Sequence, residues 1–352
     1  MLHLCNTLKP SGEPPYQVDA EGTTRTMPIY QLFVEAAIAM QPQYVAMITP
    51  SRWFTGGLGL DDFRQRMIDD RHLRTLVDNP KLFDCFPGVE IKGGVSYFLW
   101  DRDHRGDCEF STRVDGKITS TVTRDLRTGS GVVIRDNRAA EILARVQRKP
   151  YESVSTLVSP RLAFSEKFRT NFRGADEPLS DGSLPIIHNH GFGYVAMSEI
   201  RHGHALIEKW KVLIPKAGDG HGREESFVLG EPIAVGPGSV CTETYFIVGT
   251  FESRTENENY AKYLATKFAR FLVLQRKSTQ DIRSEVFRFV PILDMTRQWT
   301  DDDLYDHFDL TEDERSYIER TIKPRSVNLS LDSPVPASHK PGGAKYKPNA
   351  GG

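Results

Sequence analysis

The stretch "YVAMITPSRWFTGGLGLDDFRQRMIDD" (Tyr44–Asp70) decides the fold class. It opens with a short apolar run that ends at Pro50, a pattern typical of a buried parallel strand. A helix is expected from Leu60 to Asp70, because acidic residues suit the positive end of a helix. A strand that leads directly into a helix is the building unit of an α/β protein.

The neighbouring segments continue this alternation. "PIYQLFVEAAIAM" (Pro28–Met40) predicts a helix that starts with proline, a favourable first helical residue. Its spacing places one apolar stripe on Ile29, Leu32, Phe33 and Ala36. Strands are expected at Leu73–Asn79 and Gly94–Asp101. The alternation predicts a doubly wound α/β sheet.

Two further strands and a helix follow this sheet. Cys108–Val114 and Lys117–Leu126 alternate with a period of two, which indicates an antiparallel extension. Asn137–Lys149 predicts a helix that bridges to a second domain.

The character of the chain changes from about Tyr151. Short strands and Gly/Pro turns dominate as far as Glu252, and Asn259–Gln275 then predicts one long helix. Two Thr-x-x-acid patterns resemble capping boxes that open short helices, at Thr300/Asp303 and Thr311/Glu314. The final residues, 326–352, are rich in Pro, Gly and Lys and predict a disordered tail.

The composition excludes several classes of protein. The 352 residues are 39% hydrophobic and 26% charged, with a net charge of −2, which fits a globular protein without a global signal for nucleic acid. No apolar run is long enough for a membrane span. The four cysteines, Cys5, Cys85, Cys108 and Cys241, lack CxxC spacing, which favours a reducing cytoplasm over a disulfide framework.

The segment "SGEPPYQV" (Ser11–Val18) carries a possible chemistry. An enzyme that methylates the amine of adenine must extract the base from the duplex and accept both amine hydrogens. In such a motif Glu13 offers a side-chain acceptor, Pro14 a carbonyl held by the rigid Pro14-Pro15 pair, and Tyr16 a flat face for the base. The same letters also occur in ordinary polyproline turns.

Three other patterns are weaker. "HNHG" (His188–Gly191) matches the name of a nuclease class but not its dispersed metal ligands. A zinc site built from nearby histidines lacks a completing cysteine or acidic cluster. Gly218-x-Gly220-x-Gly222 follows a predicted strand, but "REESFVLGEP" after it does not read as the helix that a donor-binding loop requires.

Basic residues gather between Lys262 and Arg297 and alternate with phenylalanines. Such a stripe is either a solvated helix face or the lining of a DNA cleft. The members chosen as candidate DNA-binding residues are Lys267, Arg270, Arg276, Lys277 and Arg283.

From Glu13 to about Arg325 the chain resembles the adenine-specific (N6) DNA methyltransferases of type II restriction–modification systems. "EPPYQ" stands where that family has Asn-Pro-Pro-Tyr, and "ITPSRWFTGGLGLDDFR" and "DCFPGVEIKGGVSYFLWDRDHRGDC" follow in the family's order. "VLIPKAG", "PGSVCTETYFIVG" and "TKFARFLVLQRKSTQD" resemble its target-recognition region.

The resemblance implies an organisation. Residues 1–125 would form the C-terminal half of a Rossmann-like methyltransferase sheet, residues 126–150 a connecting helix, and residues 151–325 an α+β target-recognition domain. It also implies S-adenosylmethionine as methyl donor, double-stranded DNA as partner and a cytoplasmic location. Phe86 of "CFPG" would stack on the other face of the adenine, and Arg52 of "SRWF" would contact a phosphate near the target base. The neighbouring residues Trp53 and Phe54 are expected to pack in the core.

Two departures from the family are visible. Glu13 replaces the shorter Asn, which would displace the acceptor oxygen by about 1.5 Å and can cost about 10²-fold in rate. The family's donor pocket lies ahead of the motif, where this chain has twelve residues. We therefore expect a second polypeptide to supply the donor-binding half. The alternative is a catalytically inactive DNA-binding remnant that keeps the recognition domain.

Overall fold

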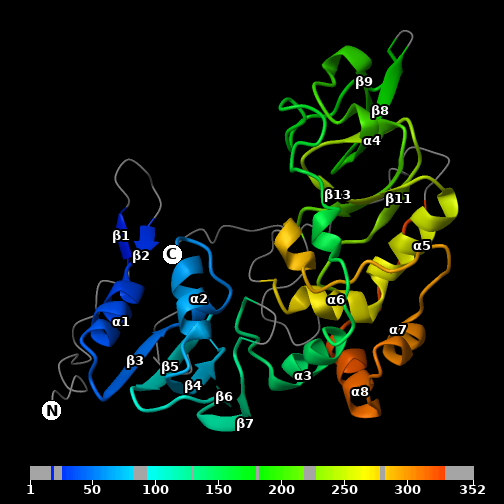
Figure 1. Ribbon diagram of the computed structural model, residues 1–352. Coiled ribbons are helices and arrows are strands. Elements are labelled where there is room, and N and C mark those ends of the chain that lie inside the picture. The colour runs from blue at the N-terminus through cyan, green and yellow to red at the C-terminus, as the bar shows by residue number, and fades with distance from the viewer. Residues whose placement is uncertain are drawn as a thin grey trace, which may run out of the picture. The chain divides into compact units, whose positions relative to one another are not determined.

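Two units make up the chain, Met1–Lys149 and Pro150–Gly352 (Figure 1). The structure is a computed structural model that describes residues 17–19, 26–81, 93–127, 131–179, 182–217, 227–277 and 282–329. Within the described residues the first unit contains a five-stranded mixed sheet, and the second contains two three-stranded sheets and a set of helices.

The elements of the first unit alternate between strands and helices. In chain order they are β1 (Gln17–Asp19), β2 (Thr26–Pro28), α1 (Tyr30–Ala39), β3 (Tyr44–Pro50), the 3-10 helix η2 (Ser51–Phe54), α2 (Asp61–Asp69), β4 (Leu73–Asn79), β5 (Val95–Asp101), β6 (Cys108–Val114), β7 (Lys117–Arg124) and α3 (Asn137–Val146). The predicted strands β4 to β7 and the predicted helices α2 and α3 are confirmed.

The strand order of the large sheet is β3-β5-β4-β6-β7. Strand β5 lies between β3 and β4 and runs antiparallel to both. β6 pairs parallel with β4, and β7 closes the sheet as the expected antiparallel neighbour of β6. The mixed α/β character is confirmed, whereas the expected parallel pairing of β3 is wrong. β3 pairs antiparallel with β5, and its side chains alternate between buried and exposed.

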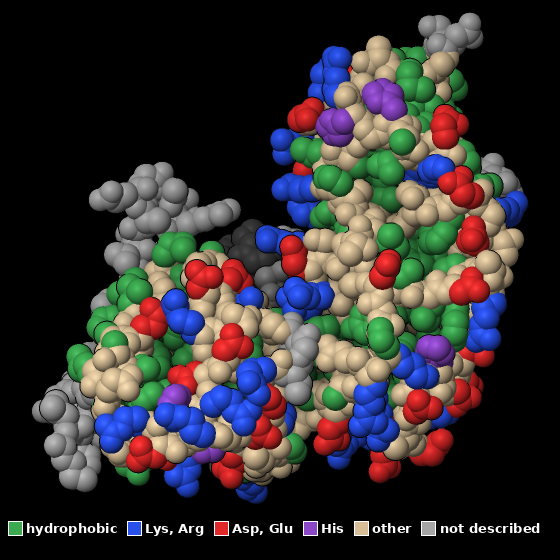
Figure 2. Space-filling model, in the orientation of Figure 1, with side chains coloured by type: hydrophobic (Ala, Val, Ile, Leu, Met, Phe, Trp, Pro, Cys, Tyr) green, Lys and Arg blue, Asp and Glu red, His purple; other side chains and the backbone are tan. Residues whose placement is uncertain are grey.

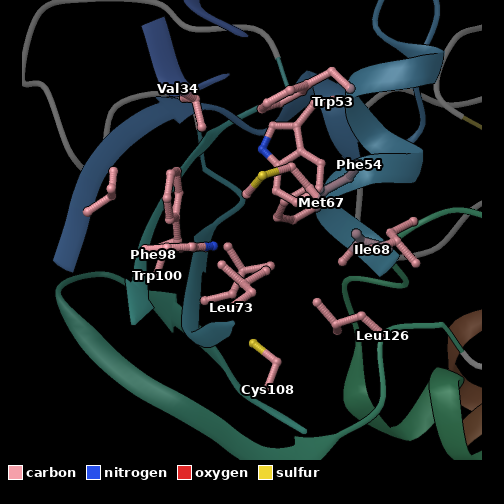
Figure 3. Close-up of a cluster of buried hydrophobic side chains, with 14 of the residues drawn as sticks. Val34, Trp53, Phe54, Met67, Ile68, Leu73, Phe98, Trp100, Cys108 and Leu126 are labelled. Atoms are coloured by element: carbon pink, nitrogen blue, oxygen red, sulfur yellow. The ribbon is translucent and has the colours of Figure 1, made fainter. Parts of the chain in front are cut away.

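One buried hydrophobic cluster holds the first unit together (Figure 3). Trp53 and Phe54 lie in it, less than 2% exposed, and their rings meet edge to face at 4.7 Å. Trp100 of β5 and Phe63 of α2 complete the packing. The core interpretation of Trp53 and Phe54 is confirmed. Because both are buried, the residue before them, Arg52, is held in place by their packing.

Helix α1 turns a different face inward from the one predicted. It begins at Tyr30 rather than at Pro28, which lies in β2. Its buried residues are Tyr30, Val34 and Ala37, whereas Leu32 is 57% exposed. The predicted stripe was wrong because this helix is apolar on several faces, so periodicity alone cannot select the buried one.

The second unit begins with short elements. In chain order the elements are η3 (Val154–Thr156), β8 (Ser183–His188), β9 (Gly191–Ala196), η4 (Met197–Glu199), α4 (His204–Ile207), β10 (Trp210–Pro215), β11 (Ile233–Val235), β12 (Val240–Cys241), β13 (Tyr245–Phe251), α5 (Arg254–Ala265), α6 (Lys267–Leu274), η5 (Ser284–Phe287), α7 (Asp301–His307) and α8 (Glu312–Thr321). One sheet has the order β12-β8-β9 and the other β11-β10-β13. The expected β texture between Tyr151 and Glu252 is confirmed.

The single helix predicted for Asn259–Gln275 is wrong. The chain breaks at Thr266, whose ψ of 151° ends α5 and starts α6. Thr266 Oγ1 accepts a hydrogen bond from Ala269 N, and the Asp301 carboxylate accepts from Lys267 N and Phe268 N. These acceptors satisfy amide groups that a continuous helix would have satisfied by itself.

The C-terminal helices follow the predicted caps. Both capping boxes are present, Thr300 with Asp303 at α7 and Thr311 with Glu314 at α8. Order continues further than expected, because Asn328 N donates to Pro232 O and Asn328 O accepts from Ala234 N. Residues 330–352 lie outside the described residues. In the described part of the chain, no helix combines the length and apolar character needed to span a bilayer.

Candidate functional site

The candidate site in the first unit lies at one end of the large sheet. Pro50 at the end of β3 and Asn79 at the end of β4 both pair with Val95 at the start of β5. The turn that carries Arg52 therefore starts at the same sheet end that segment 82–92 leaves and re-enters. Phe86 belongs to that segment and lies outside the described residues.

A buried polar cluster ties this sheet end together. The Asp78 side chain is fully buried at the end of β4, where one carboxylate oxygen accepts from Ser51 Oγ at 2.8 Å. Arg135 makes a bidentate pair with the same carboxylate, Nε to Oδ2 at 2.8 Å and Nη2 to Oδ1 at 2.7 Å. Paired, planar contacts of this kind are the strong form of the Arg–carboxylate interaction. The cluster links the η2 turn, β4 and the segment before α3.

Close backbone packing completes this end of the sheet. Ser51 N donates to Gly94 O at 2.9 Å, and Gly94 has a positive φ of 79°. A Cβ at Gly94 would lie 2.2 Å from Asn79 O and 3.0 Å from Arg135 Nη2. Only glycine fits there, so the end of β4 and the start of β5 pack closely against each other.

Sequence reasoning missed Ser51, Asp78 and Arg135. The partners are 27 and 57 residues apart, so no local spacing indicates that they meet. The available signal was weak: an aspartate follows an apolar run, and a buried aspartate requires a partner.

Arg52 is the predicted DNA contact that the structure places at this sheet end. Its side chain is exposed while Ser51, Trp53 and Phe54 around it are buried. The predicted base clamp, Glu13, Pro14, Pro15 and Tyr16, lies outside the described residues, which start with β1 at Gln17. β1 pairs antiparallel with β2, immediately before α1.

The predicted basic stripe of the second unit does not form one surface. Arg270 is fully buried in α6, and its guanidinium donates to the carbonyl oxygens of Ala265, Thr266, Phe227 and Lys323. Burial lowers the pKa of Arg270 to about 10, so the group still carries its charge at neutral pH. Arg270 therefore joins α6 to the segments that contain Phe227 and Lys323.

Of the other four basic candidates, three contact groups of the protein, and Arg283 is exposed. Lys267 Nζ lies 2.5 Å from Glu319 Oε2, and Lys277 Nζ donates to Val228 O. Arg276 lies over the Phe289 ring, with its guanidinium carbon 5.4 Å from the centroid. Arg283, just before η5, is exposed. The structure brings Lys267 and Arg270 together on α6, whereas Arg283 precedes η5.

The histidines of the second unit that the structure describes include the buried His188. Burial, followed by the charge of Arg173, lowers the pKa of the His188 imidazole. Among the residues that the structure describes, no group of three or more His, Cys, Asp or Glu side chains is placed to hold a metal ion. Gly218, Gly220 and Gly222 fall outside them.

Comparison with known proteins addresses the family directly. Residues 10–86 match the family model described as "Eco57I restriction-modification methylase". The predicted resemblance is confirmed for this segment. It covers Glu13–Tyr16, α1, β3, η2, α2, β4 and Phe86.

Two longer matches accompany the match of residues 10–86. A protein of Mycoplasma pneumoniae, described as an uncharacterized adenine-specific methylase, is 29% identical over 173 residues, 46% of this chain and 40% of that protein. The solved structure of the type IIG restriction endonuclease BpuSI matches with 10% identity and a TM-score of 0.32, over 84% of this chain and 44% of that one. The chain spans less than half the length of either protein.

Proposed function

We propose that this protein is a site-specific DNA adenine-N6 methyltransferase of a restriction–modification system. The observation that carries the proposal is the match of residues 10–86 to the Eco57I methylase family, because that segment includes both halves of the predicted base clamp. The adenine-specific name of the Mycoplasma pneumoniae relative supports adenine as the target base.

The proposed chemistry uses five groups of this chain. Glu13 and the carbonyl of Pro14, stiffened by Pro15, accept hydrogen bonds from the two N–H groups of the adenine amine, which frees the nitrogen lone pair to attack the methyl group. Tyr16 and Phe86 enclose the flipped base between two aromatic faces. Arg52 contacts a phosphate close to the target base.

The Ser51–Asp78–Arg135 cluster would support this arrangement by holding the turn that carries Arg52 in place. It lies where the Arg52 turn and the Phe86 segment begin, and it contains a fully buried carboxylate with both oxygens engaged by protein groups. A rigid base of this kind keeps contacting side chains within the narrow tolerance that catalysis requires.

The methyl donor implied by the family is S-adenosylmethionine. Among the described residues of the first unit, the buried acid at the end of β4, Asp78, has both carboxylate oxygens bonded to Ser51 and Arg135, so it is not available to the ribose of a donor. We propose that a second polypeptide supplies the donor-binding residues, and that residues 151–325 act as the recognition domain for double-stranded DNA.

The decisive experiment is transfer of a radiolabelled methyl group to unmethylated DNA. We expect incorporation into N6-methyladenine by the wild-type chain, alone or with the polypeptide that completes the donor site, and loss of incorporation in Tyr16→Ala. Tyr16→Phe, which keeps the stacking face, serves as the matched control. Equal incorporation by Tyr16→Ala and wild type would contradict the proposed clamp.

Glu13 allows a sharper version of the same assay. If the extra methylene of Glu13 misplaces its oxygen, Glu13→Asn should raise the rate by up to about 10²-fold. The rival function, a DNA-binding remnant without catalysis, is favoured by this same departure from the family. Salt-sensitive DNA binding without methyl transfer by either the wild-type chain or the Glu13→Asn variant, with the donor-binding half present, would establish the rival.

A further inference from the structure

We infer that the loop Arg161–Gly174, clamped by the buried Glu243, is the surface of the second unit that contacts the DNA backbone. The inference rests on the proposed function, since it assigns the contact surface of the same DNA partner. It replaces Lys267 and Arg270, whose side chains are occupied inside the unit, as the main source of positive charge.

The loop carries exposed basic side chains at close intervals. Arg161, Lys167 and Arg169 are exposed, Arg173 is half-buried, and the exposed polar residues Thr170 and Asn171 stand between them. Figure 2 shows Lys, Arg and His side chains interspersed with Asp and Glu at the β8–β9 end of this unit. The loop itself contains four basic residues and one acidic residue, Glu166, and Glu243 adds a second carboxylate, so positive charge is in excess.

Glu243 holds the loop in one conformation. Its carboxylate is 4% exposed, and Oε1 accepts from Thr170 N at 3.0 Å and from Thr170 Oγ1 at 2.8 Å. Arg161 Nη2 lies 2.8 Å and Arg169 Nη1 3.7 Å from the other oxygen. Burial would raise the pKa of this carboxyl, but the Thr170 hydrogen bonds and the two guanidinium charges outweigh burial and lower it.

Two further features make the loop rigid. Phe164 and Phe168 of the loop are buried, and Phe172 packs against Phe168 with ring centroids 4.9 Å apart. At the far end, Ala175 and Tyr194 of β9 exchange two backbone hydrogen bonds of 2.8 Å. A Cβ at Gly193 would lie 1.9 Å from Arg173 O, so the loop and β9 are in direct backbone contact.

The arginines are anchored in a way that leaves donors available. Arg173 Nη1 donates to Thr170 O and Phe172 O, and Arg169 Nε donates to Glu166 O. The Arg169 side chain remains 58% exposed and the Arg161 side chain 50%. A guanidinium that is fixed through some of its N–H groups and exposed through others is suited to a phosphate oxygen. Preorganised basic groups of this kind neutralise phosphates and set the register of a protein on the duplex.

The test compares two double variants of the full chain. Lys167→Gln/Arg169→Gln removes two charges from the loop, and Arg254→Gln/Lys262→Gln removes two charges from α5 as a matched control. Binding of a short fluorescent duplex is followed by anisotropy between about 50 and 200 mM salt. We expect the loop variant to bind at least ten-fold more weakly and to lose about two units of slope in the plot of log affinity against log salt, with the control unchanged.

A second measurement uses the wild-type chain alone. Lysine acetylation read by mass spectrometry should show Lys167 protected by bound duplex and Lys262 unprotected. Binding of duplex with no effect of the loop variant and no protection of Lys167 would overturn this inference and leave the proposed function intact. Competition by polyglutamate as effective as duplex would overturn it as well, and failure of the wild-type chain to bind duplex at any salt would overturn both.

Discussion

The two basic regions of the second unit contain the same residue types but use them differently. On α6, Lys267 pairs with Glu319, and the buried Arg270 donates to four carbonyl oxygens. In the Arg161–Gly174 loop, the guanidinium groups of Arg161 and Arg169 are anchored at one side and exposed at the other. A segment rich in Lys and Arg therefore does not by itself indicate a binding surface. The partners of each side chain must be known first.

The largest expected effect lies at Arg270. Arg270→Met should lower the free energy of unfolding by about 3 kcal/mol or more, because four carbonyl groups lose a buried, charged donor. Urea denaturation of the full chain measures this loss. The exposed Arg283 provides the comparison, since Arg283→Met should change stability by less than about 0.5 kcal/mol. Equal effects at the two positions would remove the structural role assigned to Arg270.

Lys211 of β10 extends the comparison to a buried lysine. It is 1% exposed, its ammonium donates to Gly236 O and Ser239 Oγ, and burial lowers its pKa to about 8. Between about pH 8 and pH 10.5 the unfolded chain binds a proton that the folded chain has released, so stability rises with pH in that window. Below pH 8 both states are protonated and the buried charge keeps its full cost.

The measurement for Lys211 is the pH dependence of unfolding. From pH 8 to pH 9 the wild-type chain should gain about 1 kcal/mol relative to Lys211→Met, which has no group to titrate there. A difference between the two proteins that stays constant from pH 7 to pH 10 would show that Lys211 is not held in a low-dielectric site.

Lys267 should show an intermediate effect. Its side chain is 17% exposed and binds both the carboxylate and the backbone carbonyl of Glu319. Lys267→Met should cost about 1 kcal/mol, the ordinary net value of one hydrogen bond, because the partner Glu319 is exposed. Unfolding of Lys267→Met in the background of Glu319→Gln gives the coupling energy, and a coupling near zero would place Lys267 with the exposed basic residues.

The smallest effect on stability is expected in the loop. Lys167→Gln/Arg169→Gln should change the free energy of unfolding by less than about 0.5 kcal/mol, because both side chains are exposed and the Glu243 anchor keeps Arg161 and Thr170. Thermal unfolding of this variant checks it. Destabilisation of the size expected for Arg270→Met would show that Lys167 and Arg169 stabilise the fold, as Arg270 does.

Patterns within a few residues predicted much of the fold. The Thr300/Asp303 and Thr311/Glu314 capping boxes are present as predicted, since both partners belong to one helical turn. Strands β4 to β7 were also predicted, because alternation and apolar runs report a local preference for extended chain. The family resemblance of residues 10–86 was predicted on the same kind of contiguous segment.

Other features depended on partners distant in the sequence. The break at Thr266 is stabilised by Asp301, which lies 34 residues from Lys267, so no helix propensity in Asn259–Gln275 could reveal it. The pairing of β3 depended on which strand lies beside it, and apolar composition is the same for parallel and antiparallel partners. The roles of Arg52, Phe86 and Glu13–Tyr16 stay predictions.

The sequence by itself determined most of the strands, the capping boxes of α7 and α8 and the resemblance of residues 10–86 to a methylase family, because these depend on short-range sterics, hydrogen bonds and contiguous motifs. Tertiary structure alone decided which basic side chains are paired inside the fold, as Arg270 is by four carbonyls and Arg135 by Asp78, and which remain exposed, as Lys167 and Arg169 do. The reason is that a charge is neutralised by whatever group packing brings within about 4 Å of it, and that neighbour is set by the fold rather than by the adjacent residues.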